Sequence, residues 1–225
     1  MWTFEKLALD IPSGESRGVV TAEMWERVQE PLIVSPNRPS GVGTTHIEID
    51  LTHQVLVVFE DDEAVVLSHI SSGDDHEWCE TVTYDTDVDG IRLEQSVEDA
   101  FCGVSRTPGG VFTVSHVVEG TWRTPLGPLV NPIYSNEGIA IHGSEAVPDR
   151  PISRGDVRVP IPVSERLMDV VDVGDRVLVW DGEHEPEDVT GEQMRPQLAV
   201  QDGDVASSPA ALEPDTIPST SFEDG

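Results

Sequence analysis

The chain has 225 residues, which is enough for one good-sized domain with appendages. Its 43 acidic residues against 13 basic ones give a net charge of −30, and such a surface repels nucleic acid and anionic membranes. A role in binding nucleic acid is therefore disfavoured, and the simplest interpretation of the charge is a solvated acidic surface.

The sequence shows neither a membrane-spanning segment nor a signal peptide. No stretch approaches the roughly 20 apolar residues of a membrane span, and the N-terminal MWTFEKLALD lacks the basic-then-apolar pattern of a signal peptide. The two cysteines, Cys79 and Cys102, are too few for a disulfide-framed mini-protein, and their spacing fits no zinc motif. From the residues alone, one disulfide in an exported domain and two free thiols are comparable interpretations.

The first 30 residues predict a small helical fragment. WTFEKLAL and TAEMWERVQ each carry apolar residues at a spacing of three to four. Thr21 is a plausible N-cap, with Trp25, Val28 and Met24 as the residues that could face inward. Two helices of this size cannot bury a core alone, so they dock on the main domain or are part of something larger upstream. Residues 31–44, rich in proline and glycine, predict a linker.

Residues 45–180 predict one domain that is mainly β, a sandwich or barrel-like fold with one short helix. Alternating apolar residues predict strands at 46–51, 54–59, 64–70, 110–117, 138–142 and 176–179. A helix is expected over 163–170, with Ser164 as its cap and Leu167, Met168 and Val171 on one side. Residues 124–127 and 131–134 are expected to be turns.

The remainder of the chain, residues 181–225, predicts an acidic disordered tail. Its acidic residues outnumber its basic ones twelve to one, and Pro, Ser, Gly and Gln are frequent.

Four segments of the β region resemble the catalytic domain of the L,D-transpeptidases, bacterial enzymes that cross-link peptidoglycan stem peptides. The matching stretches are IEIDLTHQVLVVF at 47–59, SSG at 71–73, TPGGVFTV at 107–114, and HG at 142–143 followed by SRGDVR at 153–158. The last corresponds to the family pattern HG followed by S-x-G-C-x-R. The order of the four and the last motif are specific, and together they span about 60% of the chain.

The resemblance implies a site and a chemistry. Family enzymes use a cysteine thiolate to form a thioester with a donor stem peptide, which an acceptor amine then resolves. His142 would be the base, oriented by the carbonyl of Gly143, and backbone N–H groups of the turn would stabilise the oxyanion. The residues that the resemblance implies for substrate binding are Ser153, Arg154, Gly155 and Arg158, together with Tyr134 and Trp122, which could line a groove. No cofactor and no metal are expected.

Asp156 departs from the family pattern because it occupies the position of the nucleophilic cysteine. Carboxylates act as nucleophiles mainly on glycosidic or phosphoryl centres. Attack on an amide would give a mixed anhydride, a far worse intermediate than a thioester. We therefore expect a degenerate family member that binds stem peptides without cross-linking them. The alternative is an active transpeptidase or hydrolase that uses His142 with a nucleophile other than cysteine.

Several other roles are weighed for these residues. Asp156 could cap the amides of its own turn or pair with Arg154, which would lower its reactivity further. A metal site of Asp156 and His142 with Asp149 or Glu145 has no supporting ligand spacing. Cys102 as a relocated nucleophile is a remote alternative, because the resemblance favours a disulfide between Cys79 and Cys102. Trp78 could also line the groove.

Residues 2–29 resemble the later part of a small helical peptidoglycan-binding module. The matching residues are Phe4, Lys6, Leu7, Gly18, Val20, Thr21, Trp25 and Val28. That module has a further helix upstream, so the exported protein is expected to begin before Met1. By resemblance we expect a protein of the cell envelope or the extracellular space, monomeric, with peptidoglycan stem peptides as its partner.

Overall fold

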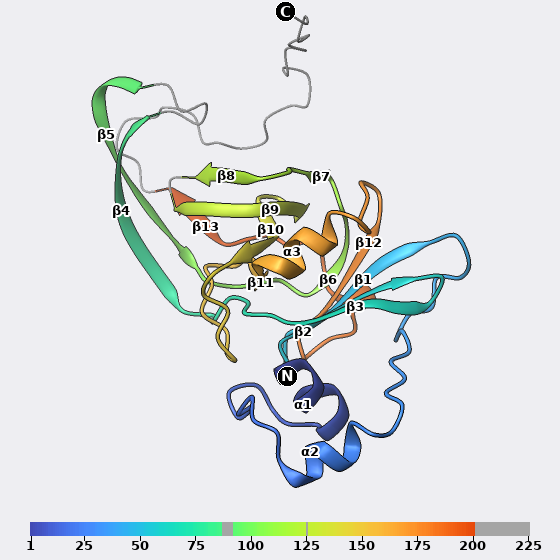
Figure 1. Cartoon of the computed structure of the whole chain (residues 1–225). Coiled ribbons are helices and arrows are strands. Elements are labelled where there is room, and N and C mark those ends of the chain that lie inside the picture. Colours follow the sequence, from blue (N-terminus) through green and yellow to red (C-terminus); the bar gives the residue numbers. More distant parts are fainter. Residues whose placement is uncertain (87–91, 125, 201–225) are drawn as a thin grey trace, which may run out of the picture.

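Two five-stranded sheets, a three-stranded sheet and three short α-helices make up the protein in this computed structural model, which describes residues 1–86, 92–124 and 126–200 (Figure 1). The first sheet has the strand order β3-β2-β1-β12-β6. Its strands are β1 (Thr45–Asp50), β2 (Val55–Glu60), β3 (Glu63–His69), β6 (Gly110–Thr113) and β12 (Arg176–Trp180). The strands β1 and β12 are parallel, and the other neighbours are antiparallel.

The second sheet carries the motif that ends in Arg158. Its order is β11-β10-β9-β7, and β8 pairs with another part of β9. The strands are β7 (His116–Val117), β8 (Thr121–Thr124), β9 (Gly127–Asn136), β10 (Ile139–Ser144) and β11 (Val157–Pro160). The expected strand at 110–117 is therefore two strands, since the chain leaves the first sheet after Thr113 and joins the second at His116.

The main hydrophobic core joins the two sheets and the helix α3 (Ile161–Leu167), and a smaller cluster of Val55, Val57 and Phe59 lies on the other face of β2. The strand residues of this main core alternate with residues of the opposite face, and the core includes Ile47, Ile49, Leu56, Val58, Ile133, Ile141, Val157, Val159, Val177 and Val179, together with Leu167 of α3. The expected mainly β fold with few short helices is confirmed. The expectation for Ser164 is wrong, because α3 begins after Pro160 and Ser164 lies buried inside it, donating to the carbonyl of Ile161 at 2.8 Å.

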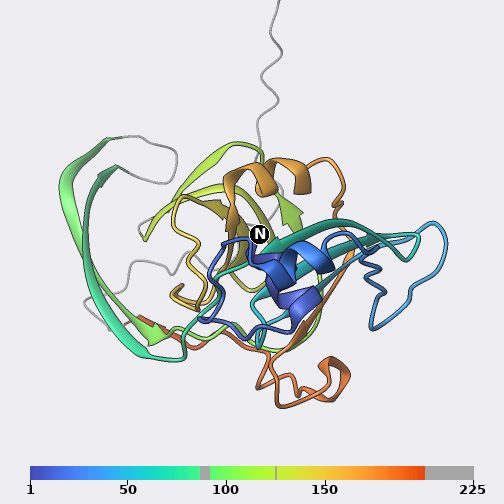
Figure 2. The ribbon, with the colours of Figure 1, turned by 60° about the horizontal axis from the view of Figure 1, so that its bottom comes forward.

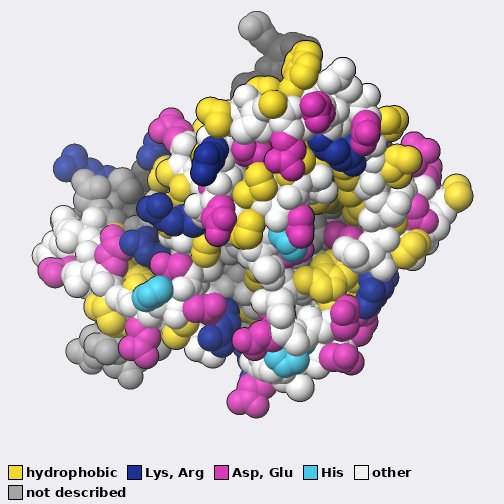
Figure 3. All heavy atoms as spheres, turned by 90° about the horizontal axis from the view of Figure 1, so that it is seen from below, with side chains coloured by type: hydrophobic (Ala, Val, Ile, Leu, Met, Phe, Trp, Pro, Cys, Tyr) yellow, Lys and Arg dark blue, Asp and Glu magenta, His cyan; other side chains and the backbone are white. Residues whose placement is uncertain are grey.

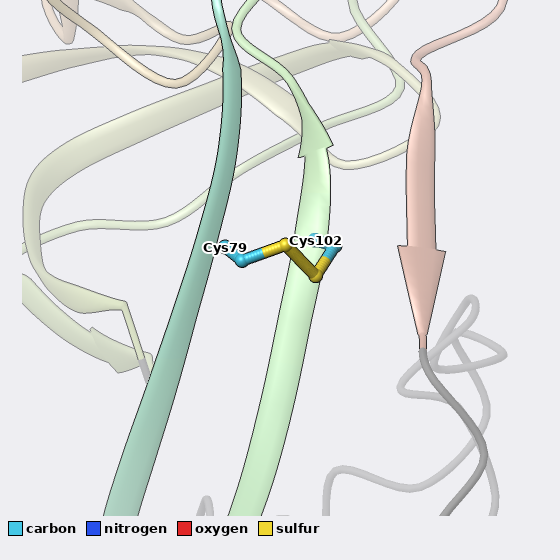
Figure 4. Close-up of a disulfide and its surroundings, with 2 residues drawn as sticks. All are labelled: Cys79 and Cys102. Carbon is cyan, nitrogen blue, oxygen red and sulfur yellow. A yellow bond between two sulfur atoms is a disulfide. The ribbon is translucent and has the colours of Figure 1, made fainter.

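A long hairpin, absent from the predicted elements, arches away from the two sheets (Figure 1). It consists of β4 (Glu77–Thr86) and β5 (Arg92–Val104), and β13 (Leu198–Val200) pairs with β5 as a third strand. A disulfide joins Cys79 to Cys102 directly across the hairpin (Figure 4). The sulfur of Cys102 is thereby used, so the alternative of a relocated nucleophile is wrong. Residues 131–134, expected to be a turn, lie within β9.

The N-terminal helices α1 (Trp2–Leu9) and α2 (Ala22–Arg27) lie below β2 and β3 (Figures 1 and 2). The hydroxyl of Thr21 caps α2 by accepting from the Met24 N–H at 3.1 Å, as expected. The inward orientation of Trp25 and Val28 is wrong, because Met24 is the buried residue of α2 while Trp25 is 62% exposed. Among the described residues, no helix is long and apolar enough to cross a membrane.

The segments on either side of the sheets are bound to the domain. In residues 31–44 the backbone N–H groups of Asn37 and Arg38 donate to the buried carboxylate of Glu48 at 3.0 and 2.8 Å. Residues 181–200 form the short 3₁₀ helix η1 (Pro186–Asp188) and β13. The carbonyl of Met194 in this segment accepts from the side chain of Asn136. These 20 residues are therefore not the disordered tail that composition suggests, and 201–225 lie outside the described residues.

Candidate functional site

The residues of the SRGDVR motif and His142 meet on one face of the second sheet. Directly paired residues share a face, and alternate residues of a strand return to it. His142 on β10 pairs with Arg158 on β11, and Ala140 pairs with Tyr134 on β9, which in turn pairs with His116 on β7. The opposite face, with Ile141 and Val157, packs into the core.

His142 is buried and holds a defined tautomer. Its Nδ1 lies 3.0 Å from the carbonyl oxygen of Gly143, and since a carbonyl only accepts, Nδ1 carries the proton. Burial lowers the pKa of His142 below its usual value, against the opposing effect of the nearby Asp156 carboxylate. A neutral imidazole with a free lone pair on Nε2 results, which is the form that a general base requires. The orientation by Gly143 agrees with what the resemblance implies.

A close approach of the backbone explains why residue 143 is glycine. A Cβ on Gly143 would lie 2.4 Å from Oγ of Ser164 and 3.2 Å from Cβ of Val130. Glycine at 143 thus lets Ser164 of α3 pack directly against the strand whose carbonyl orients His142. Sequence reasoning missed this role, because the expected cap position draws attention away from a buried serine in mid-helix.

Asp156 faces His142 across a gap. Its Oδ2 lies 3.8 Å from Nε2 of His142, too far for a direct hydrogen bond, and its Oδ1 accepts from the N–H of Ala140 at 2.9 Å. The side chain is 28% exposed. Burial raises the pKa of the Asp156 carboxyl, whereas His142, the Ala140 N–H and Arg158 act in the opposite direction. Residue 156 therefore lies where a proton could pass to His142, as the position of a nucleophile requires.

The turn of residues 153–156, here called the site turn, is held by hydroxyl groups. Oγ of Ser153 donates to the carbonyl of Asp156 at 2.5 Å and accepts from the N–H of Gly155 at 3.1 Å. Oγ of Thr107 donates to the carbonyl of Gly155 at 2.6 Å. Gly155 has a φ of 130°, and a Cβ there would lie 3.0 Å from the carbonyl oxygen of Arg106. Only glycine meets both conditions without strain.

Arg154 points to the hairpin and not to Asp156, so the expected pairing between those two is wrong. Its guanidinium forms an ion pair with Glu80 on β4 and lies 4.9 Å from the ring centre of Trp78. Glu80 and Trp78 alternate along β4 and so share the face that meets the site turn. Nothing in the sequence identifies Glu80 as a partner, because the hairpin itself is not predicted.

Arg158 is half-buried near the carboxylate of Asp156. Its backbone exchanges two hydrogen bonds with Ser71, both 3.0 Å. The guanidinium has no hydrogen bond or ion pair to a side chain within residues 1–86, 92–124 and 126–200. Burial lowers the pKa of Arg158, although Asp156 acts in the opposite direction. A planar cation with unused donors is suited to a carboxylate ligand.

Aromatic residues flank this face on the side of β9. Burial, with a further contribution from the Asp156 carboxylate, raises the pKa of Tyr134 to about 12. The ring of His116, which sequence reasoning did not single out, stacks on Tyr134 with centroids 4.3 Å apart. Trp122 lies on β8 and pairs with Leu129, further along β9. Tyr134 is thus close to the centre of the site, and Trp122 lies toward its edge.

The alternative metal set of His142, Asp156 and Asp149 does not come together. Asp149 turns away to Lys6, with Oδ1 2.5 Å from Nζ. In the described part of the chain, no group of three or more His, Cys, Asp or Glu side chains could hold a metal ion.

Charge is unevenly distributed around the site. Three arginines lie near the site. Arg154 belongs to the site turn, Arg158 to the strand β11 that follows it, and Arg106 to the segment whose backbone packs against Gly155. On the face shown in Figure 3, basic side chains gather on the side of the β4–β5 hairpin, among acidic side chains that are spread over the whole face. Of the three arginines, Arg106 is paired with Asp75 and Arg154 with Glu80.

Replacing Asp156 by asparagine is expected to stabilise the fold by about 1 kcal/mol at pH 7 and to leave it unchanged at pH 3. The pKa of Asp156 is raised above 3.8 in the folded protein. As the pH rises, the carboxyl of Asp156 therefore loses its proton in the unfolded chain before it does so in the folded protein. Between pH 3.8 and the pKa in the folded protein, the wild type therefore loses stability relative to Asp156→Asn. The amide oxygen of asparagine still accepts from the N–H of Ala140. Urea unfolding at several pH values measures the difference. An equal or larger gap at pH 3 would contradict the stated cause.

The chain is similar to known proteins in sequence and in fold. The family model of the L,D-transpeptidase catalytic domain (YkuD) matches residues 44–179. A crystal structure of an L,D-transpeptidase (residues 123–326) from Xylanimonas cellulosilytica is 29% identical, with a TM-score of 0.60 over 80% of this chain and 78% of that one. The L,D-transpeptidase of Stackebrandtia nassauensis is 20% identical, with a TM-score of 0.45 over 80% of this chain and 75% of that one, a superposition too loose to support further argument. No curated protein sequence matches the chain. Because the matched segment covers more than half of its residues, the chain belongs to the L,D-transpeptidase (YkuD) family.

Proposed function

We propose that this protein binds peptidoglycan stem peptides at the face of His142, Asp156 and Arg158, and that it does not cross-link them. The observation that carries the proposal is the carboxylate 3.8 Å from Nε2 of His142, at the position of the family's thiolate. The family implies a peptidoglycan substrate. The proposal is supported by the contact between Nδ1 of His142 and the carbonyl of Gly143 and by the hydrogen bonds within the site turn.

The chemistry of the carboxylate argues against family-type transfer. Attack of an Asp156 oxygen on an amide carbonyl would form a mixed anhydride, and the expelled amine would have to be protonated as it leaves. In the reverse direction, the tetrahedral intermediate expels the carboxylate far more readily than the amine. A thiolate forms a thioester that lasts long enough for the acceptor amine to attack. We infer that the site retains recognition and lacks the covalent step.

Arg158 is the residue that we expect to recognise the ligand. Its half-buried guanidinium has donors that the described residues leave unused, and stem peptides carry carboxylates. The surrounding protein is acidic, so an anionic ligand needs this local cation to overcome the long-range repulsion. The helical fragment 1–30, with its resemblance to a peptidoglycan-binding module, also supports binding to the wall. The disulfide of the hairpin supports a place in the cell envelope or outside the cell.

Cosedimentation with purified peptidoglycan tests the binding proposal. We expect Arg158→Gln to weaken retention roughly tenfold, since hydrogen bonds to charged groups contribute about 1.5–3 kcal/mol. Arg166→Gln is the matched control, because Arg166 pairs with Asp169 on the exposed side of α3. Retention no better than that of an unrelated acidic protein, or equal binding by the two variants, would refute the proposal.

The contact between Asp156 and His142 also favours a second candidate, an active transpeptidase or hydrolase that works without cysteine. Incubation with a tetrapeptide stem donor and an amine acceptor, followed by mass spectrometry, tests it. Turnover by the wild type that disappears in Asp156→Ala would establish the enzyme and exclude the non-catalytic binder.

A further inference from the structure

Lys6, the only lysine of the chain, is buried where α1 meets the domain. Its side chain is 0% exposed. Its Nζ lies 2.5 Å from Oδ1 of Asp149 and donates to the backbone carbonyl of Gln54 at 3.2 Å. A buried ammonium is tolerated only when it is paired and hydrogen-bonded, so these two contacts determine how α1 sits on the domain. Each contact leads toward the site turn by a different route.

The first route runs through the connecting loop, residues 145–152, which joins β10 to the site turn. Asp149 lies in this loop, and its Oδ2 accepts from the N–H groups of Gly14 at 3.1 Å and Ser16 at 2.9 Å. Nε2 of His69 is 3.2 Å from the carbonyl of Val147, and the ring of Trp2 meets His69 edge-on. The N-terminal segment thus binds the loop that spaces residue 156 from His142.

The second route is a hydrogen-bonded path through the interior. The side chain of Gln54 donates to Oγ of Ser72 at 2.7 Å and accepts from the Ser72 N–H at 2.8 Å. The carbonyl of Ser72 accepts from the N–H of Ser153 at 2.8 Å, and Oγ of Ser153 donates to the carbonyl of Asp156. Gln54, Ser72 and Ser153 are each at most 1% exposed. Water cannot substitute for a missing partner along such a path, so a shift at one end is passed to the next group.

We propose that Lys6 is a positioning residue for the site turn: through Asp149 and through Gln54 it sets the distance between residue 156 and the imidazole of His142. The N-terminal helices then hold the connecting loop in place for the site, independently of any peptidoglycan binding by the helices themselves. The inference rests on the proposed function only in taking residue 156 as the centre of the site. Without Lys6, the Asp149 carboxylate is left buried without its cation, and the loop must open to solvate it.

A thiol placed at residue 156 reports on this geometry. In the background Asp156→Cys, this thiol is the only one in the protein, because Cys79 and Cys102 are joined. The rate of its alkylation by iodoacetamide between pH 5 and 9 gives the thiol pKa, which depends on the distance to His142. We expect Lys6→Met to raise that pKa and to slow alkylation at pH 6 roughly fivefold, the low end of couplings between protein sites. Arg27→Met, which breaks an exposed pair with Glu30 in the same N-terminal segment, should leave the profile unchanged.

A double variant covers the case in which Lys6→Met does not fold. Lys6→Met with Asp149→Asn removes both buried charges while the amide oxygen still accepts from Gly14 and Ser16, so the fold should persist. It also lacks the contact between Lys6 and Gln54, so it must shift the pH profile in the same direction as Lys6→Met, by a smaller amount because the connecting loop stays bound. A folded single or double variant with the parent's profile overturns the proposal, and so does an equal shift in Arg27→Met. Peptidoglycan cosedimentation plays no part in this readout, so failure of stem-peptide binding would be seen separately.

Discussion

Replacing Asp156 by cysteine is expected to make the protein react covalently with a β-lactam, while the wild type stays unmodified. The reason is geometric: Nε2 of His142 faces residue 156, and Nδ1 is already held by the carbonyl of Gly143. A thiol at this position can pass its proton to the imidazole and attack as a thiolate. We expect the rate of adduct formation to exceed that of the wild type by roughly 10³-fold or more.

Intact-protein mass spectrometry measures the adduct as the added mass of the opened β-lactam. The variant Asp156→Cys with His142→Ala is the matched control, because it keeps the thiol and removes the base. Acylation of the single variant alone would show a site that lacks only its nucleophile. An inert but folded Asp156→Cys would mean that the site has lost more than the thiol, and an acylated wild type would contradict the proposed non-catalytic role.

The largest loss of stability is expected from Gly73→Ala. A Cβ on Gly73 would lie 2.0 Å from the carbonyl oxygen of Ser105 and 3.0 Å from the backbone nitrogen of Thr107. Both neighbours are backbone, which cannot rotate away as a side chain can, so we expect a cost of about 3 kcal/mol. The N–H of Gly73 also donates to Oγ of Thr107, which itself donates to the carbonyl of Gly155. The substitution should therefore disturb the site turn as well.

Urea unfolding measures this cost, with Gly191→Ala as the control. Gly191 has open space where its Cβ would be and an ordinary φ, so alanine there should be neutral within about 0.5 kcal/mol. Equal free energies of unfolding for the two variants would show that the backbone around Gly73 can move to accommodate a Cβ, and would contradict the expected cost. Peptidoglycan retention of Gly73→Ala below its unfolding temperature should also fall, if Thr107 holds the site turn as the hydrogen bonds indicate.

Local pattern predicts the strands that pack into the core. The strands β1, β2, β3, β10 and β12 follow the expected ranges within about two residues, because a continuous apolar run or an alternation of apolar residues records burial directly. The hairpin β4–β5 has no such record: the described side chains of β4 alternate only between exposed and half-buried, those of residues 94–98 on β5 are all exposed, and pairing and the disulfide hold the hairpin together. The helix α3 was expected two residues too late because proline, without a cap side chain, begins it.

The site was partly predictable for a related reason. The motif places His142, Gly143 and Arg158 on adjacent strands, and their register follows once those strands pair. The contacts between distant segments do not follow. Arg154 reaches Glu80, 74 residues away, and Lys6 reaches Asp149 across almost the whole domain. Periodicity within a window of 11–18 residues carries no information about such pairs.

The disulfide of the hairpin has a consequence for the chemical robustness of the protein. A site built on a thiolate is inactivated by peroxide, which oxidises the sulfur to a sulfenic acid and then to irreversible sulfinic and sulfonic acids. Here the sulfurs of both cysteines are joined between β4 and β5, and residue 156 is a carboxylate that peroxide leaves intact. We therefore expect this site to keep binding stem peptides under oxidative conditions that would inactivate a relative with a catalytic cysteine.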